Sequence, residues 1–372
     1  MGADGKDFLT ACVVGYEVGC RAGEYLGRSH YEVCVNPNNH HPSEHLCLWF
    51  KKFHSTATAG VLGVAAAAAR LLKLDAQKTL SAIGSAGTQA AGLWQFMVDA
   101  THSKQVHTGK ACFDGIFAAY TARDGLLGTS DILEGPRAMG VALVPGQTTP
   151  QAIDRNLGTD FAILRSSFKW HASCRHTHPS VDALLNLMGK NGVAFDDVES
   201  VVTRTYQAAF DVLGLSGIGE TIHQSKFSMG FVLAVAAKNG QAMITDFTED
   251  ALKDASLREF QKRVTMELDE EIDRQFPEKW QGTVIVTTKS GKQFTESVSF
   301  AKGDPELPLT RYAFPLLAVH SDTIDNSPRP ELEGKTRALA TYGGVTDAVK
   351  VDLLIERAWN LENENSLGGF TF

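Results

Sequence analysis

Hydrophobic side chains recur at helical spacing through residues 8–128. Four segments place apolar residues three and four positions apart, the pattern of a helix with one buried face. These segments are residues 7–27, 55–74, 75–97 and 109–125. Glycine and alanine are frequent within them, and because small residues let helix axes approach closely, this half of the chain is predicted to be a bundle of tightly packed helices.

The pattern of apolar positions changes after about residue 160. Residues 198–207 alternate apolar and polar side chains, as in a half-buried strand. Residues 282–300 alternate in the same way on both sides of Lys-Ser-Gly at 289–291, which predicts a β-hairpin. The second half of the chain therefore contains β-structure.

Helices are predicted between and after these strands. One begins near Pro179, one ends at Gly240, and residues 257–276 form a third with a heavily charged face. Residues 346–365 return to helical periodicity. Strands mixed with helices in this way predict an α+β domain.

Together these elements predict a mostly α fold, with a large all-helical domain and a smaller α+β domain. We expect the helical domain over 1–158, the α+β domain over 159–310, and C-terminal helices over 331–372 that pack back on the helical domain. The length of 372 residues suits about two domains, and the 43% apolar content suits a globular protein.

Composition narrows the classes of function. The formal net charge of −8 argues against nucleic acid as a partner, because phosphate backbones attract basic proteins. Six cysteines without a Cys-x-x-Cys pair predict reduced thiols in a cytoplasmic or mitochondrial protein. The longest apolar run, at 60–74, is too short to span a membrane, so no membrane partner is predicted. The sequence carries no standard motif for nucleotide binding, serine hydrolysis or zinc proteolysis.

Two segments, 33–52 and 313–330, have neither helical nor alternating periodicity. Both are predicted to be long surface loops. The first contains three histidines and two cysteines, but their spacing matches no standard zinc pattern. No metal site is therefore predicted.

A positive cluster stands out in the sequence SFKWHASCRHTHPSVDALL at 167–185. It surrounds one thiol with cationic and imidazole side chains, namely Lys169, His171, Arg175, His176 and His178 around Cys174. If a helix begins at Pro179, the preceding loop lies at the positive end of a helix, which favours anions. We interpret the loop as a carboxylate receptor. Cys174 is either a nucleophile whose pKa the cations lower or a small buried hydrophobic residue, and the second interpretation is favoured.

A second basic stretch, THSKQVHTGKACFDG at 101–115, has the same design. Lys104, His107 and Lys110 are predicted to lie on a glycine-containing turn before an apolar helix. His54 lies at a third helix start. Basic loops on two domains favour a small-molecule site in a cleft between them. Isolated histidines at 30, 223 and 320 are interpreted as structural or surface groups.

These stretches resemble one protein family. In order along the chain they are GYEVGCRAGEYLG, FHSTATAG, GSAGTQAAGLWQF, SKQVHTGKACFDG, ILEG, KWHASCRHTHPSVDAL and ELEGKTRALA. They are similar to the MmgE/PrpD family, which includes 2-methylcitrate dehydratase and cis-aconitate decarboxylase. The resemblance implies a large helical domain, a smaller α+β lid domain, a homodimer, and an active site between the domains that uses no cofactor.

The resemblance also assigns roles to residues. It implies catalytic roles for His54, Lys104, Lys169 and His178. The substrate-binding residues are taken to be His107, Cys174, Arg175 and Phe231. Phe231 occupies a position that is usually tyrosine in the family, so a hydroxyl group is missing there.

The chain departs from the family pattern in two ways. Family members carry roughly a hundred further N-terminal residues, including acid and base groups, which makes this chain N-terminally truncated by comparison. The segments 33–52 and 313–330 fall where the family has almost nothing. We hypothesise that both are retained introns and that Met1 is an internal methionine.

The expected substrate is a tricarboxylate. The Lys169, Cys174 and His178 pattern resembles decarboxylase-like members more than bacterial 2-methylcitrate dehydratases, so the expected function is a cis-aconitate decarboxylase-like lyase. Phe231 favours an alkyl-substituted substrate, as in fungal secondary metabolism. Two alternatives stay open, an alkylcitrate dehydratase and an inactive remnant or partner subunit of a full-length paralogue.

Overall fold

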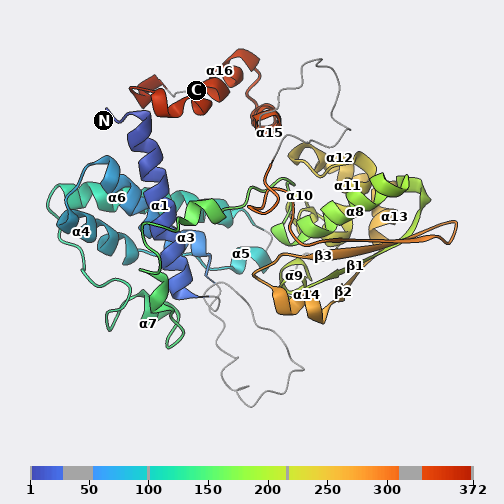
Figure 1. Cartoon of the computed structure of the whole chain (residues 1–372), viewed down its shortest axis with the longest axis horizontal. Coiled ribbons are helices and arrows are strands. Elements are labelled where there is room, and N and C mark those ends of the chain that lie inside the picture. Colours follow the sequence, from blue (N-terminus) through green and yellow to red (C-terminus); the bar gives the residue numbers. More distant parts are fainter. Residues whose placement is uncertain (1, 28–52, 99–100, 215–217, 310–328, 370–372) are drawn as a thin grey trace. The chain divides into compact units, whose positions relative to one another are not determined.

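The computed structural model describes residues 2–27, 53–98, 101–214, 218–309 and 329–369 (Figure 1). By their contacts the residues divide into two compact units, residues 1–165 with 356–372 and residues 166–355. The predicted loop 33–52, nearly all of the segment 313–330, and His30 and His320 lie outside the described residues. The helices in the described ranges are all too short or too polar to cross a membrane.

The first unit is helical and centres on α3 (Ser55–Leu71). This helix packs against α1 (Gly5–Leu26), α4 (Ala76–Gly87) and α6 (Ser103–Arg123). The shorter elements are α5 (Gln95–Val98), α7 (Met139–Leu143) and 3₁₀ turns at Pro150–Ala152, Ala162–Arg165, Leu361–Asn363 and Leu367–Gly369. The prediction of a helical bundle is confirmed. The predicted helix over 75–97 is interrupted, however, because α4 ends at Gly87 and α5 begins only at Gln95.

Glycine residues set the distance between α1 and α3. A Cβ atom on Gly63 of α3 would overlap the carbonyl oxygen of Gly15 and lie 3.1 Å from the Cα atom of Gly19, both on α1. On the opposite side, a Cβ atom on Gly115 of α6 would lie 2.7 Å from the Cβ atom of Val64. The backbones therefore touch at these crossings, as the small-residue pattern predicted.

The second unit contains a four-stranded sheet with the order β2-β1-β3-β4. Its strands are β1 (Val198–Thr205), β2 (Val264–Leu268), β3 (Gly282–Thr288) and β4 (Gln293–Val298). Strand β1 pairs in parallel with β2 and antiparallel with β3, and β3 pairs antiparallel with β4. The predicted strand at 198–207 and the predicted hairpin turning at 289–291 are both confirmed.

Helices precede, separate and follow the strands of this sheet in the sequence. They are α8 (His178–Asn191), α9 (Gln207–Leu213), α10 (Ile222–Ser225), α11 (Met229–Asn239), α12 (Glu249–Lys253), α13 (Ala255–Lys262), α14 (Glu270–Gln275), α15 (Arg329–Tyr342) and α16 (Ala348–Trp359), with 3₁₀ turns at Arg175–Thr177, Phe195–Asp197 and Ile244–Asp246. Pro179 lies in the first turn of α8, and α11 ends before Gly240, whose φ of 70° suits a glycine at a helix end. Both predicted helix limits are confirmed.

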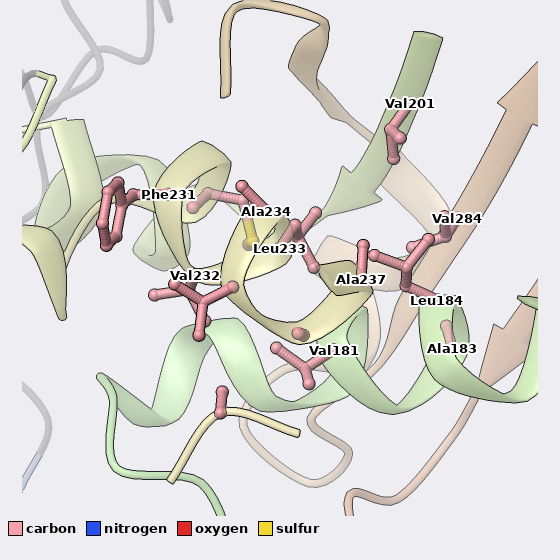
Figure 2. Packing of buried hydrophobic residues seen from close by; sticks show 14 of the residues in the cluster. Val181, Ala183, Leu184, Val201, Phe231, Val232, Leu233, Ala234, Ala237 and Val284 are labelled. Carbon is pink, nitrogen blue, oxygen red and sulfur yellow. The ribbon is translucent and has the colours of Figure 1, made fainter. Parts of the chain in front are cut away.

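The core of this unit lies where α8 and α11 meet the sheet (Figure 2). Figure 2 shows Leu184 of α8 beside Val284 of β3. Val181 of α8, Leu233 of α11 and Val201 of β1 belong to the same cluster. None of these five side chains has exposed surface. Burial of each aliphatic side chain stabilises the fold by about 1.5–3 kcal/mol relative to exposure, so this packing fixes α8 on the sheet.

The prediction of a single helix over 257–276 is wrong. The segment forms α13, then β2, then α14. Within β2, Val264 and Met266 pack against the core, whereas Thr265 and Glu267 are exposed. This alternation suits a strand paired with β1, and the tertiary pairing overrides the helical tendency of the charged residues around it.

The C-terminal residues divide between the two units. Helix α15 belongs to the second unit, where Glu331 pairs with Lys302. Residues 356–372 group with the first unit, and Glu364 accepts a hydrogen bond from the Gly5 backbone N–H at 2.8 Å.

The glycine crossing generates a stability prediction. Replacing Gly63 by alanine should lower the free energy of unfolding by about 1–3 kcal/mol, because the new methyl group meets the α1 backbone and no side chain can move aside. Gly60→Ala on the same helix is the matched control, since its Cβ atom would be 3.9 Å from the nearest atom outside the adjacent helix backbone, on the side chain of Thr56. The control should be neutral or stabilising by up to about 1 kcal/mol. Urea unfolding followed by circular dichroism measures both, and equal effects would contradict the backbone contact.

Candidate functional site

Two groups of basic side chains occur in the structure, one in each unit. The first is the His54 cluster, which we define as His54, Lys104 and His107. His54 is the N-cap residue of α3, and its backbone N–H donates to the carbonyl of Gly92 at 2.9 Å. Its side chain is only 5% exposed. The sequence had indicated a histidine at a helix start, and that prediction is confirmed.

Aromatic packing holds the two imidazole rings of this cluster. The ring centroids of His54 and His107 are 5.6 Å apart, and Phe96 lies 5.9 Å from His54 and 5.4 Å from His107. Gly92 has a φ of 138°, and a Cβ atom there would lie 3.2 Å from Nδ1 of His107. A glycine at this position therefore lets the ring approach the backbone.

Lys104 and His107 lie one turn apart on α6, which begins at Ser103. The predicted turn before the helix is wrong, because the helix already includes both residues. Spacing of three positions places them on one helix face. Lys110 pairs instead with Asp114, so its charge is compensated within α6.

Burial and positive charge determine the protonation of His54. Desolvation lowers its pKa to about 4, with Lys104 and His107 adding to the decrease. The imidazole is therefore neutral at neutral pH. The Nδ1 atoms of His54 and His107 are buried and have no hydrogen-bond partner among the described residues. A buried polar atom of this kind favours a bound partner.

The second group lies on the loop before α8 and on the start of α8. We name the loop, residues 166–174, the Lys169 loop. The loop forms neither helix nor strand, and it connects the 3₁₀ turn at Ala162–Arg165 to the 3₁₀ turn at Arg175–Thr177 before α8. Its backbone N–H groups at Phe168, Ala172 and Cys174 donate to Gly303, Ala242 and Lys226 carbonyls, each at 2.8 Å. The loop is thus fixed by segments distant in the sequence.

Lys169 is exposed at the surface of this unit. Its Nζ atom donates to the carbonyl of Ser173 at 3.2 Å, which directs the side chain back along the loop. Because the ammonium group is exposed and its loop is fixed, a carboxylate can bind to it without any rearrangement of the loop. The structure is therefore compatible with the predicted binding role.

His178, in contrast, is completely buried at the start of α8. Desolvation lowers its pKa well below the usual value, and His171, Arg175 and Lys169 add to the decrease. Its ring lies 5.1 Å from that of His171 in an edge arrangement. The Nε2 atom of His178 and the Nδ1 atom of His171 have no partner among the described residues.

Two carboxylates that no sequence pattern had indicated organise the neighbourhood of His178. Asp182 contacts Nε2 of His171 at 2.8 Å and accepts the backbone N–H of Lys302 at 2.7 Å. Asp304 pairs with Arg175 and accepts the hydroxyl of Ser167 at 2.6 Å. Asp182 lies eleven positions after its partner His171, and Asp304 lies 129 positions after its partner Arg175, so neither pair has a local spacing in the sequence that indicates it.

The remaining predicted site residues are largely enclosed. Arg175 forms an ion pair with Asp304, and its Nη1 atom lies 3.3 Å from Nδ1 of His178. Cys174 is 6% exposed and packs in the core, which confirms the interpretation as a buried residue. His176 stacks on Trp280 with centroids 4.9 Å apart, and burial lowers its pKa to about 3.

Phe231 of α11 lies in the core of the second unit and has no exposed surface (Figure 2). Its ring is 6.5 Å from that of Phe247, and the guanidinium of Arg258 lies 5.0 Å from its centroid. Direct contact with substrate has no support in this packing, because neighbouring side chains already cover the ring.

Comparison with known proteins places these residues in a family. The chain matches the MmgE/PrpD N-terminal domain over residues 1–152 and the MmgE/PrpD C-terminal domain over 171–314. It is 24% identical over 360 residues to the cis-aconitate decarboxylase-like protein oryM of Aspergillus oryzae, covering 92% of this chain and 70% of that protein.

Two further relatives are named cis-aconitate decarboxylase. One, from Aspergillus terreus, is 25% identical over 347 residues, which is 88% of this chain and 67% of the relative. The human protein is 25% identical over 269 residues, which is 70% of this chain and 54% of the relative. The His54 cluster falls within the match to the N-terminal domain, and His171 to Asp182 fall within the match to the C-terminal domain. The chain belongs to the MmgE/PrpD family.

Proposed function

We propose that this protein is a cis-aconitate decarboxylase-like lyase that acts on cis-aconitate or on an alkyl-substituted tricarboxylate. The observation that carries the proposal is the His54 cluster, in which two imidazole rings 5.6 Å apart have buried Nδ1 atoms with no partner among the described residues, and Lys104 lies one helical turn from His107. The names of the relatives from Aspergillus terreus and human support the same reaction.

An anionic substrate fits the charges of this cluster. A carboxylate next to Lys104 would offset the positive charge of its ammonium group and would raise the pKa of His54. Lys169 would bind a second carboxylate through its exposed ammonium group. Binding two carboxylates fixes the substrate and leaves the third free to depart.

The reaction then proceeds by cleavage of one carbon–carbon bond. The bond to the departing carboxylate breaks, carbon dioxide leaves, and the electron pair stays on an allylic carbanion. One proton added to carbon completes the reaction, so the trianion and a proton give a dianion and carbon dioxide. Lys104 and Lys169 would stabilise the charge on the retained carboxylates, and His54 or His178 would position or deliver the proton.

A 2-methylcitrate or alkylcitrate dehydratase would use the same cations on a similar substrate. It would remove a proton next to a carboxylate and protonate the departing hydroxyl group. The names of the relatives favour decarboxylation. The mass of the product distinguishes the two reactions directly.

The first experiment is a thermal-shift titration of the chain with citrate, 2-methylcitrate and cis-aconitate, followed by mass spectrometry. Stabilisation with loss of carbon dioxide from cis-aconitate supports the proposal. Loss of water from a citrate identifies a dehydratase instead. A folded chain that binds no tricarboxylate contradicts the proposal and supports a partner subunit or an inactive remnant.

We also propose that the protein assembles as a homodimer. Helix α6 exposes Val106, Phe113 and Phe117 by 66%, 68% and 51%, and the two phenyl rings stack with centroids 6.2 Å apart. Exposed aromatic residues of this kind favour burial against a second copy. Sedimentation equilibrium tests the stoichiometry.

Replacement of either lysine should abolish turnover while the fold survives. Lys104→Ala and Lys169→Ala should each lower kcat/KM by on the order of a hundredfold or more, because each removes a charge that stabilises a carboxylate. The exposed Lys6 and Lys253 provide matched alanine controls in the two units. Circular dichroism checks the fold, and wild-type activity in both site variants would contradict the proposed carboxylate binding.

Substrate binding should also take up a proton. At pH 6 the free His54 is neutral, because its pKa is about 4. A bound carboxylate raises that pKa, so a proton is taken up on binding. Calorimetric titrations in buffers with different ionisation enthalpies measure the uptake. His54→Asn should reduce it, and His223→Asn, outside the cluster, should not. Substrate binding without proton uptake would contradict this prediction.

A further inference from the structure

The Lys169 loop depends on other segments for its backbone hydrogen bonds. A segment without helix or strand leaves its N–H and C=O groups unpaired unless other parts of the structure bind them. Three N–H groups of the loop bind carbonyls, as described above. The carbonyls of Lys169 and Trp170 are bound by a side chain, the ammonium group of Lys335 on α15.

The geometry of this contact is specific. Lys335 Nζ donates to the carbonyl of Lys169 and to that of Trp170, the second at 3.2 Å. Successive carbonyls of an extended chain point in opposite directions, so two that reach one nitrogen require a turned backbone. An ammonium group has three donors at one point and can serve both oxygens together. Burial lowers the pKa of Lys335, which agrees with its partly buried side chain.

A second contact ties the same turn to α15. The ammonium group of Lys302 lies 4.2 Å from the ring centroid of Trp170 and 2.5 Å from the carboxylate of Glu331 on α15. The side chains of Lys302 and Glu331 are only 13% and 4% exposed. Since breaking one partner of a buried ion pair leaves an uncompensated charge, this pair resists displacement of α15.

We infer that Lys335 is a positioning residue for Lys169, holding the backbone from which the Lys169 side chain extends. The inference rests on the proposed function, in which Lys169 binds a substrate carboxylate. Lys335 acts only through the two carbonyls of the turn. Its loss displaces the ammonium group of Lys169, and a displacement of about 1 Å is enough to weaken a positioned contact on the order of a hundredfold.

The experiment compares three variants of the full chain. Lys335→Met removes the donors and keeps much of the length of the side chain, and Lys335→Arg keeps several donors. Arg337→Met is the matched control on α15, because Arg337 pairs with Asp352 and Glu333 at the surface rather than with the loop.

Hydrogen–deuterium exchange over a peptide spanning 166–174 gives a readout that does not require activity. Lys335→Met should accelerate exchange there by on the order of tenfold, whereas Lys335→Arg and Arg337→Met should resemble the wild type. Unchanged exchange in a folded Lys335→Met protein would overturn the inference. If this variant does not fold by circular dichroism, Lys335→Ala, which removes the donors and most of the side chain, is judged by the same criterion.

Kinetics separate positioning from a general loss of stability. Lys335→Met should raise KM for cis-aconitate on the order of tenfold with a smaller decrease in kcat, and Lys335→Arg should restore most of the affinity. A decrease in kcat alone, proportional to the folded fraction, would contradict positioning. If the wild-type chain converts no tricarboxylate, the proposed function fails, and the exchange measurement still decides whether Lys335 holds the loop.

Discussion

Removing basic groups from water is the constraint on which both candidate sites depend. A buried imidazole must stay neutral or gain an anionic partner, and a buried ammonium or guanidinium group needs acceptors. The structure meets this requirement differently at each position. Arg175 has Asp304, His171 has Asp182, and His54 is kept neutral by burial and by the nearby cations. Where the fold supplies no anion, a carboxylate substrate can supply one.

The second unit shows how packing supports this chemistry. The sheet and the helices α8 and α11 share a core of fully buried aliphatic side chains. Helix α8 then carries His178 in its first turn and Asp182 on the following turn. His178 and Asp182 therefore lie on a helix whose position is fixed by apolar burial, while the Lys169 loop before it is held by hydrogen bonds from residues far along the chain.

Sequence patterns predicted the elements whose signals are local. The β3–β4 hairpin, the start of α8 and the end of α11 each depend on residues within a few positions, such as Pro179 and Gly240. Strand β2 was missed because its five residues lie between charged helices and become a strand only by pairing with β1. Among the site residues, clustering of basic side chains indicated His54, Lys104 and Lys169. Asp304 and Lys335 were missed because no local spacing connects them to their partners Arg175 and Lys169, which lie 129 and 166 residues away in the sequence.

The contact between Gly63 and Gly15 has a consequence for how the protein can diverge. Two backbones in direct contact contain no side chain that can be exchanged for a slightly larger or smaller one, so the spacing of α1 and α3 has few accessible variants. The Lys169 loop is held by side chains from several segments, each of which can change separately. Selection in the laboratory for new substrates should therefore accumulate substitutions around the loop and its supporting residues, and leave the helix crossing unchanged.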